Sequence, residues 1–204
     1  MWRGGAMDRD GNIALKKAAL RVAMVDRRRS IPEPLRVEMN REIAARLLAL
    51  PELLTVRHIH IYLSHQALAE VDTVQIIEAL AVMKKRLSVP LVRVGDISSA
   101  QYHPGDEVKA TLAGYPEPAV YTEADESDLD LVVVPLLSFD ARGYRLGYGK
   151  GMYDRFFCRL SCSGLTPVRL GVSYLQQQCE KLPVDPWDEP LDAVVHQAGI
   201  IRYT

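Results

Sequence analysis

The run Leu131-Val-Val-Val134 constrains the fold of this chain more than any other stretch. It lies within residues 129–137, which we predict to form one strand, and it places apolar side chains on both faces of that strand. A strand that is apolar on both faces is typical of a parallel sheet covered by helices on each side, because a half-exposed antiparallel strand would alternate apolar with polar residues. The sequence therefore predicts a central, fully buried strand in an α/β protein.

Helix and strand patterns alternate along the rest of the chain. We predict helices over residues 13–29, 30–50, 73–85 and 152–160, and further strands over residues 59–63, 87–94, 168–174 and 192–196. The second helix is expected to begin at Ser30-x-x-Glu33, a capping-box pattern that includes Pro32, and the third to be entered through Asp72. Residues 95–126 are rich in turn signals and are expected to hold short strands that shape a site rather than a packed layer. The alternation predicts a three-layer α/β fold, with an open, mainly parallel sheet and helices on both faces.

Length and composition limit the possible classes of protein. With 204 residues the chain is long enough for one well-buried core, and we expect a single domain over residues 13–204 after a flexible N-terminal tail over residues 1–12. A net charge of −1 gives no reason to expect a nucleic acid or a membrane surface as partner, and no apolar run approaches the roughly 20 residues of a membrane span. The three cysteines are too few for a disulfide framework and the first residues lack a signal-peptide pattern, so we expect a cytoplasmic protein.

A glycine-rich segment follows the predicted central strand: Arg142-Gly-Tyr-Arg-Leu-Gly-Tyr-Gly-Lys-Gly-Met-Tyr-Asp-Arg155. Glycine lets the backbone approach a ligand closely, and successive N–H groups at the start of a helix form an anion-binding concavity. The segment matches neither the Walker A loop nor the dinucleotide-binding glycine pattern. A plain glycine-rich turn is the alternative, but the place between a buried strand and a helix favours a cradle for a polyphosphate.

Charged residues elsewhere leave two interpretations open. Asp154 follows the glycine loop, and Asp188 lies in a Pro-rich connection. Two carboxylates together with phosphate oxygens and water would suit Mg²⁺, whereas a single aspartate near a helix start is more often a cap. Lys17 and Arg21 lie four residues apart and so share one helix face, which could meet either a ligand or water.

Several motifs together resemble one known family. Residues 135–155 resemble the signature of 5-formyltetrahydrofolate cyclo-ligase, also called methenyltetrahydrofolate synthetase. The resemblance extends over nearly the whole chain, in the order Lys17-x-x-Leu-Arg21, Tyr62-Leu-Ser64 with Glu70-Val-Asp-Thr73, Gly114-Tyr-Pro-Glu-Pro118, Leu182-Pro-Val-Asp-Pro-Trp-Asp188 and Leu191-Asp-Ala-Val-Val195. Motifs in the right order are far more specific than any one of them.

The resemblance implies an enzyme and a reaction. It implies a ligase of folate and one-carbon metabolism that binds ATP with Mg²⁺ and cyclises 5-formyltetrahydrofolate to 5,10-methenyltetrahydrofolate. ADP and phosphate would be released through a phosphorylated N5-formyl intermediate. We expect a cytoplasmic monomer whose partners are these two small molecules, without nucleic acid or membrane.

The resemblance also implies roles for particular residues. ATP would be bound by Lys17, Arg21, Arg145, Leu146, Gly147, Tyr148, Gly149, Lys150, Gly151, Met152 and Tyr153. The folate would meet Leu68, Glu70, Tyr148, Gly149, Lys150, Gly151, Met152 and Tyr153. Asp154 and Asp188 would hold the metal, and the catalytic residues would be Arg145, Lys150 and Asp154. Charge neutralisation by Arg145, Lys150 and Mg²⁺ suits phosphoryl transfer, which asks the protein mostly for positioning and electrostatics.

Two other hypotheses stay open. The link from Ser64 to Glu70 is longer than is usual in the family, which would suit a paralogue that acts on another formylated or carboxylated compound. The basic helix over residues 16–29 would suit a non-catalytic nucleotide, folate or RNA-binding protein, although the near-neutral net charge argues against strong binding to a nucleic-acid backbone.

Overall fold

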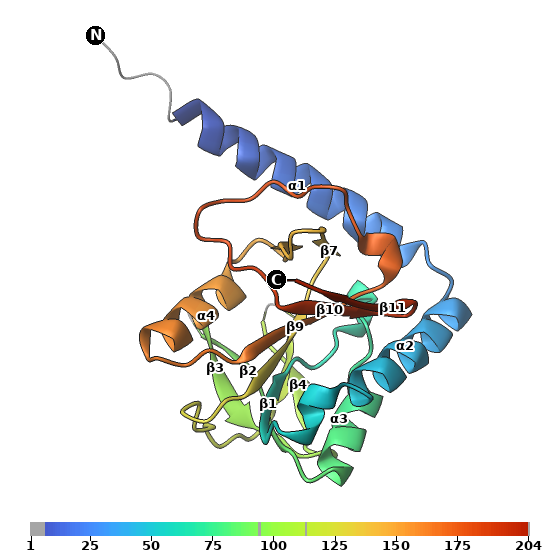
Figure 1. Ribbon diagram of the computed structural model, residues 1–204, viewed down its shortest axis with the longest axis vertical. Helices are drawn as coiled ribbons and strands as arrows, with labels where there is room; N and C mark the ends of the chain where they lie inside the picture. The colour runs from blue at the N-terminus through green and yellow to red at the C-terminus, as the bar shows by residue number, and fades with distance from the viewer. Residues whose placement is uncertain (1–6, 94, 113, 204) are drawn as a thin grey trace.

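A seven-stranded sheet forms the centre of the molecule. The computed structural model describes residues 7–93, 95–112 and 114–203 (Figure 1), and within them the strand order is β11-β10-β9-β6-β1-β2-β3. The strands are β1 (His58–Ile61), β2 (Arg86–Arg93), β3 (Asp96–Gln101), β6 (Leu131–Pro135), β9 (Val168–Val172), β10 (Ala193–His196) and β11 (Gly199–Arg202). Five neighbouring strands, from β10 to β2, run parallel, and an antiparallel strand closes each edge. The predicted open, mainly parallel sheet is confirmed.

Strand β6 is the middle strand and is buried on both faces, as its sequence predicts. Leu131 and Val133 belong to the apolar cluster on one face, and Val132 and Val134 belong to the cluster on the other. Successive side chains of a strand point to opposite faces, so an unbroken apolar run can satisfy two cores at once. Each such side chain, fully removed from water, contributes roughly 1.5–3 kcal/mol.

Helices cover both faces of the sheet, which confirms the three-layer prediction (Figure 1). Helices α2 (Glu33–Leu48) and α3 (Val74–Val82) bury Leu47 and Leu80 in the same cluster as Leu131. Helix α4 (Met152–Cys162) buries Phe156 and Phe157 against the opposite face. The fold thus places α4, and the loop that leads into it, on the opposite side of the sheet from α2 and α3.

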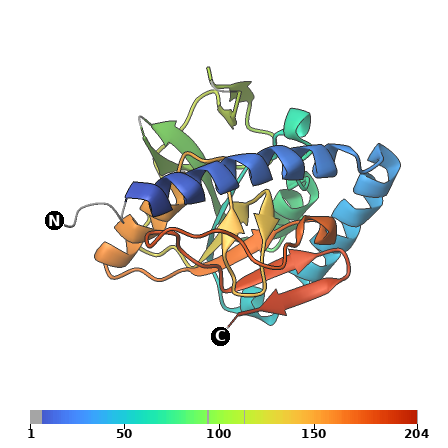
Figure 2. The ribbon, with the colours of Figure 1, turned by 90° about the horizontal axis from the view of Figure 1, so that it is seen from above.

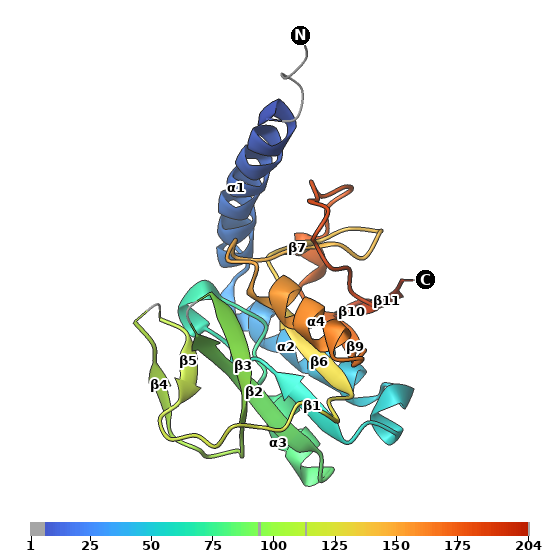
Figure 3. The ribbon, with the colours of Figure 1, turned by 90° about the vertical axis from the view of Figure 1, so that its left-hand side faces the viewer.

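A long helix, α1 (Met7–Arg29), lies across one end of the sheet (Figure 2), and its first turns extend beyond the rest of the chain (Figure 3). Of the predicted N-terminal tail over residues 1–12, residues 7–12 are helical, and residues 1–6 lie outside the described residues. Extending an existing helix fixes one residue per hydrogen bond, which costs far less than starting a new helix. Among the described residues, no helix is long and apolar enough to cross a membrane.

The segment over residues 95–126 contributes more to the sheet than its sequence predicts. Strand β3 pairs antiparallel with β2 along its whole length, with Arg93 opposite Asp96 at one end. The prediction that this segment makes no packed layer is wrong for β3, which is an edge strand of the main sheet. Its buried positions include Ser99, and a buried polar residue breaks the apolar pattern by which a strand is recognised in a sequence. The short strands β4 (Val108–Ala110) and β5 (Pro116–Pro118) do form a separate ribbon beside this edge (Figure 3).

Two smaller details also differ from prediction. Helix α2 begins at Glu33 without a side-chain cap, because the Ser30 hydroxyl donates to the Arg27 carbonyl instead. Strand β11 was not predicted and pairs with β10 as a hairpin. The remaining elements are the ribbon of β7 (Ser138–Phe139) and β8 (Arg145–Leu146), and the 3-10 turns η1 (Pro51–Leu54), η2 (Gln66–Leu68) and η3 (Leu175–Gln177).

Candidate active site

The glycine loop lies where the sequence places it, between the central strand and a helix. The chain leaves β6, passes through the β7–β8 ribbon and enters α4 through Gly151, which has a left-handed φ of 60°. Gly149 has a φ of 94°, a conformation that residues with a Cβ rarely adopt. Ligands of parallel α/β sheets bind beyond the carboxyl ends of the strands, and the N-terminus of α4 adds backbone N–H donors there.

Helix α1 supports this loop from the outside. The Arg21 side chain donates from Nε to the Gly147 carbonyl over 2.9 Å. A Cβ added to Gly149 would lie 3.0 Å from the Arg21 guanidinium carbon, so the loop and the arginine are in close contact. The Arg21 side chain thus holds the loop backbone in place, and Arg21 also lines a cavity.

A cavity of about 340 Å³ opens between α1, the glycine loop, β2 and the connection that contains Asp188. The following predicted residues line it: Lys17, Arg21, Glu70, Arg145, Leu146, Gly147, Tyr148, Gly149, Lys150, Gly151, Met152, Tyr153, Asp154 and Asp188. Leu68 does not line the cavity, so the structure gives no support to that folate contact. Its turn η2 ends at Ala69, a left-handed residue with φ 50°, after which Glu70 rather than Leu68 faces the cavity.

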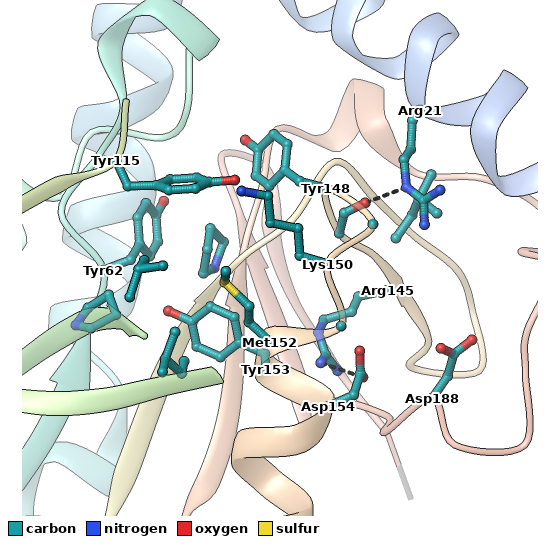
Figure 4. Close-up of a pocket in the computed structure, with 18 of the residues that line it drawn as sticks. Arg21, Tyr62, Tyr115, Arg145, Tyr148, Lys150, Met152, Tyr153, Asp154 and Asp188 are labelled. Atoms are coloured by element: carbon teal, nitrogen blue, oxygen red, sulfur yellow. Dashed lines mark hydrogen bonds and ion pairs between the residues drawn. The ribbon is translucent and has the colours of Figure 1, made fainter. Parts of the chain in front are cut away.

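One half of the cavity is charged (Figure 4). The Arg145 guanidinium, almost fully buried, donates from Nη2 to Asp154 Oδ1 over 2.7 Å and from Nη1 to the Glu189 carbonyl. Burial lowers the pKa of Arg145, and the carboxylates of Asp154 and Asp188 oppose that shift. A buried cation held by a carboxylate at the cavity wall is suited to meet an anionic ligand.

The two predicted metal ligands both reach this half. Asp188 accepts from Lys17 Nζ over 2.5 Å, and Asp185 accepts from the same ammonium over 2.6 Å. Within residues 7–93, 95–112 and 114–203, no three His, Cys, Asp or Glu side chains are grouped so as to hold a metal ion by themselves. Mg²⁺ is usually bound by one or two carboxylates together with phosphate oxygens and water. The donor set of Asp154 and Asp188 therefore fits a magnesium ion that arrives with a polyphosphate.

The other half of the cavity is aromatic. Tyr62, Tyr115 and Tyr153 lie around it, with Met152 between them and the charged half (Figure 4). The Tyr153 hydroxyl is buried and has no hydrogen-bond partner within the part of the chain that the structure describes, and burial raises the pKa of this phenol. Lys150 extends into this half, with Nζ 4.8 Å from the centroid of the Tyr115 ring. The structure thus directs Lys150 away from Arg145, although both were predicted to meet phosphate.

Glu70 links the segment after β1 to the glycine loop. Its Oε2 accepts from the His65 backbone N–H over 2.8 Å, and its Oε1 accepts a short hydrogen bond from the Tyr148 hydroxyl. Tyr148 belongs to the glycine loop, so the predicted folate residue and the predicted phosphate loop are in direct contact.

Several cavity residues were not predicted as site residues, among them Tyr62, His65, Tyr115, Asp185 and Trp187. All five lie inside or next to the short motifs that carry the family resemblance, at residues 62–64, 114–118 and 182–188. Membership of those motifs was the signal that could have identified them.

Comparison with known proteins gives the same result from the sequence and from the fold. The model of the 5-formyltetrahydrofolate cyclo-ligase family matches residues 13–197. The 5-formyltetrahydrofolate cyclo-ligase of Escherichia coli (strain K12) is 34% identical over 174 residues, which cover 83% of this chain and 93% of that protein. The mitochondrial 5-formyltetrahydrofolate cyclo-ligase of Arabidopsis thaliana is 27% identical over 217 residues, 95% of this chain and 78% of that protein.

Two solved structures share the fold. The 5,10-methenyltetrahydrofolate synthetase of Aquifex aeolicus superposes with a TM-score of 0.77 at 30% identity and covers 91% of this chain and 92% of its own. The synthetase of Mycoplasma pneumoniae superposes with a TM-score of 0.72 at 24% identity, over 89% of this chain and 98% of its own, and shows likeness of fold alone.

Proposed function

We propose that this chain, which belongs to the 5-formyltetrahydrofolate cyclo-ligase family, uses ATP and Mg²⁺ to close 5-formyltetrahydrofolate to 5,10-methenyltetrahydrofolate. The chain is an enzyme of the cyclo-ligase class, as its relatives along most of its length indicate. The observation that carries the finer proposal is one cavity with a cationic, carboxylate-bearing half and an aromatic half. Such a cavity can hold a polyphosphate beside a flat, partly aromatic molecule.

The proposed reaction proceeds in two steps. The N5-formyl oxygen attacks the γ-phosphorus of ATP, the bond to the β–γ bridging oxygen breaks, and ADP leaves. N10 of the folate then attacks the activated formyl carbon and gives up its proton, and phosphate departs with that proton as the five-membered ring closes. No side chain needs to become a nucleophile, so the protein contributes position and charge.

The charged half supplies the electrostatics of the first step. Arg145 is held by Asp154 at 2.7 Å, so its guanidinium is fixed at the cavity wall where the phosphates would bind. Lys150 has a flexible stem and can leave the Tyr115 ring to reach the γ-phosphate. Asp154 and Asp188 would hold Mg²⁺, which when bound neutralises charge on the phosphate oxygens.

The aromatic half supplies the folate site. The buried Tyr153 hydroxyl stays protonated, because burial raises its pKa, and it can donate to an oxygen of the substrate. Glu70 keeps lone pairs free beyond the two hydrogen bonds it accepts, so it can receive N–H groups of the folate. The stacked rings of the substrate would pack against Tyr62 and Tyr115.

We further propose a cytoplasmic monomer with a single domain over residues 13–204, acting on small molecules without nucleic acid or membrane. The net charge of −1 supports the absence of nucleic acid. The cysteines that the structure describes are free thiols, which supports a reducing compartment.

One assay tests the function. Purified protein is mixed with MgATP and 5-formyltetrahydrofolate, and the absorbance of the methenyl product is followed together with ADP release. We expect both products in equal amounts and neither when one substrate is omitted. ADP release without the folate would favour a paralogue that acts on another compound, and the absence of both products would refute the proposal.

A further inference from the structure

A buried arginine lies behind the site and has no part in the steps above. Arg28, in the last turn of α1, is only 1% exposed. Burying a cation is expensive unless other groups compensate it. Its Nη2 donates to the Tyr148 hydroxyl over 2.8 Å, its Nη1 donates to the Leu136 carbonyl over 3.3 Å, and its Nε finds no partner among the described residues. The best contact of this costly cation is therefore the Tyr148 phenol.

The contacts continue from Arg28 to the cavity wall. An arginine only donates, so the Tyr148 oxygen accepts from Arg28 and its proton goes to Glu70 Oε1. The result is a directed chain from a guanidinium through a phenol to a carboxylate. Tyr148 and Glu70 line the cavity, whereas Arg28 does not. In a chain of this kind each hydrogen bond polarises the next, which strengthens the hold on the terminal carboxylate.

This chain of hydrogen bonds joins segments that are far apart in sequence. Arg28 and Tyr148 are separated by 120 residues, and Tyr148 and Glu70 by 78. It therefore connects α1, the glycine loop and the link after β1 at one point. The second oxygen of Glu70 is held by the His65 N–H at 2.8 Å, so the carboxylate is fixed from two sides.

We propose that Arg28 is a positioning residue for the folate half of the site: through Tyr148 it holds the Glu70 carboxylate in the orientation that accepts N–H donors of the formylated folate. This role rests on the proposed function. Arg28 touches neither substrate, and it acts only through the phenol. The remaining lone pairs of Glu70 are the ones that the substrate would use.

The role predicts a selective kinetic effect. Arg28→Met removes the donors and keeps an apolar stem, and Tyr148→Phe removes only the hydroxyl. Each variant loses a hydrogen bond that supports a charged group, so each is expected to raise KM for 5-formyltetrahydrofolate about tenfold or more, with KM for ATP changed less than about twofold. The double variant is expected to have a folate KM no higher than that of the more impaired single variant, because both substitutions break the same series of hydrogen bonds. Arg28→Lys is expected to recover part of the loss.

Arg27→Met is the matched control, because Arg27 is the exposed neighbour and, among the described residues, its side chain donates only to the Gln176 carbonyl. All variants are compared by steady-state kinetics with each substrate varied, by calorimetric binding of 5-formyltetrahydrofolate and by thermal unfolding. Equal loss for both substrates, a lower melting temperature with unchanged KM values, or normal kinetics of Tyr148→Phe beside an impaired Arg28→Met would each overturn the role.

The wild-type protein separates this role from the proposed function. If the wild type turns over the folate and the variants have the same kinetic constants, the role of Arg28 is overturned and the proposed function stands. A wild type that binds the folate without turnover refutes the reaction, and the binding constants of the variants still decide the role of Arg28. A wild type that neither binds nor converts the folate overturns both.

Discussion

The stability of the fold should depend on pH through a histidine at the centre of the sheet. His60 on β1 is fully buried, and its Nδ1 lies 3.0 Å from the Ser99 hydroxyl and 3.4 Å from the Ser88 hydroxyl. Its Nε2 has no partner in the described part of the chain. Burial first, and then the nearby charges of His58 and Arg159, lower the pKa of His60 from 6.5 to about 3.

The direction in which stability changes with pH follows from how the folded and unfolded states bind protons. In the unfolded chain an imidazole with a pKa of 6.5 takes up a proton as the pH falls, whereas the folded chain keeps His60 neutral. The unfolded state therefore binds more protons, and stability falls as the pH drops below about 6.5, until the folded form is protonated near pH 3. For this shift the loss between pH 7.5 and pH 5 is about 2 kcal/mol. A typical domain has only about 5–15 kcal/mol of stability, so the loss is measurable.

Urea denaturation of the wild type and of His60→Gln at pH 7.5 and pH 5 measures this loss. With a denaturant slope of about 2 kcal/mol/M, the wild-type midpoint should fall about 1 M further than that of the variant. His196, whose pKa is also lowered by burial, is present in both proteins and cancels in the difference. His103→Gln, at an exposed histidine, is the control and should follow the wild type.

Equal midpoint shifts for the wild type and His60→Gln would refute the reasoning. They would mean that the folded state protonates His60 as readily as the unfolded state does. The absolute stability of the variant at pH 7.5 does not enter the test, because only the change with pH is compared.

Three predictions concern the site itself. Asp154→Asn should lower turnover at least about a hundredfold by removing a carboxylate that serves a buried arginine and the proposed metal, and wild-type turnover would reject the metal role. Lys150→Ala should raise the KM for ATP, and an unchanged nucleotide KM would contradict a phosphate contact. Gly149→Ala should both strain a backbone with φ 94° and displace the guanidinium of Arg21, so ATP binding should weaken as well as stability. Gly164→Ala is the control, because its φ is also positive, at 78°, but its Cβ meets nothing within 4 Å, so only unfolding measurements should detect it.

Strand β3 shows where pattern reasoning stops. The apolar run of β6 can be recognised without a structure, because only a doubly covered strand tolerates it. In β3 the buried positions are Ile97, Ser99 and Ala100, and a buried serine is indistinguishable in sequence from one in a loop. The Ser99 hydroxyl is hydrogen-bonded to His60, which lies on another strand.

The sequence by itself determined the order of the elements, the glycine loop at the end of the buried strand and the aspartates beside it. These depend on local backbone preferences and on residue types at short spacing. Only the tertiary structure decided that Arg28 is buried, that Lys150 turns toward Tyr115, and that Glu70 rather than Leu68 faces the cavity. The environment of each of these side chains is made by segments dozens of residues away, and no local pattern encodes which distant segment a side chain will meet.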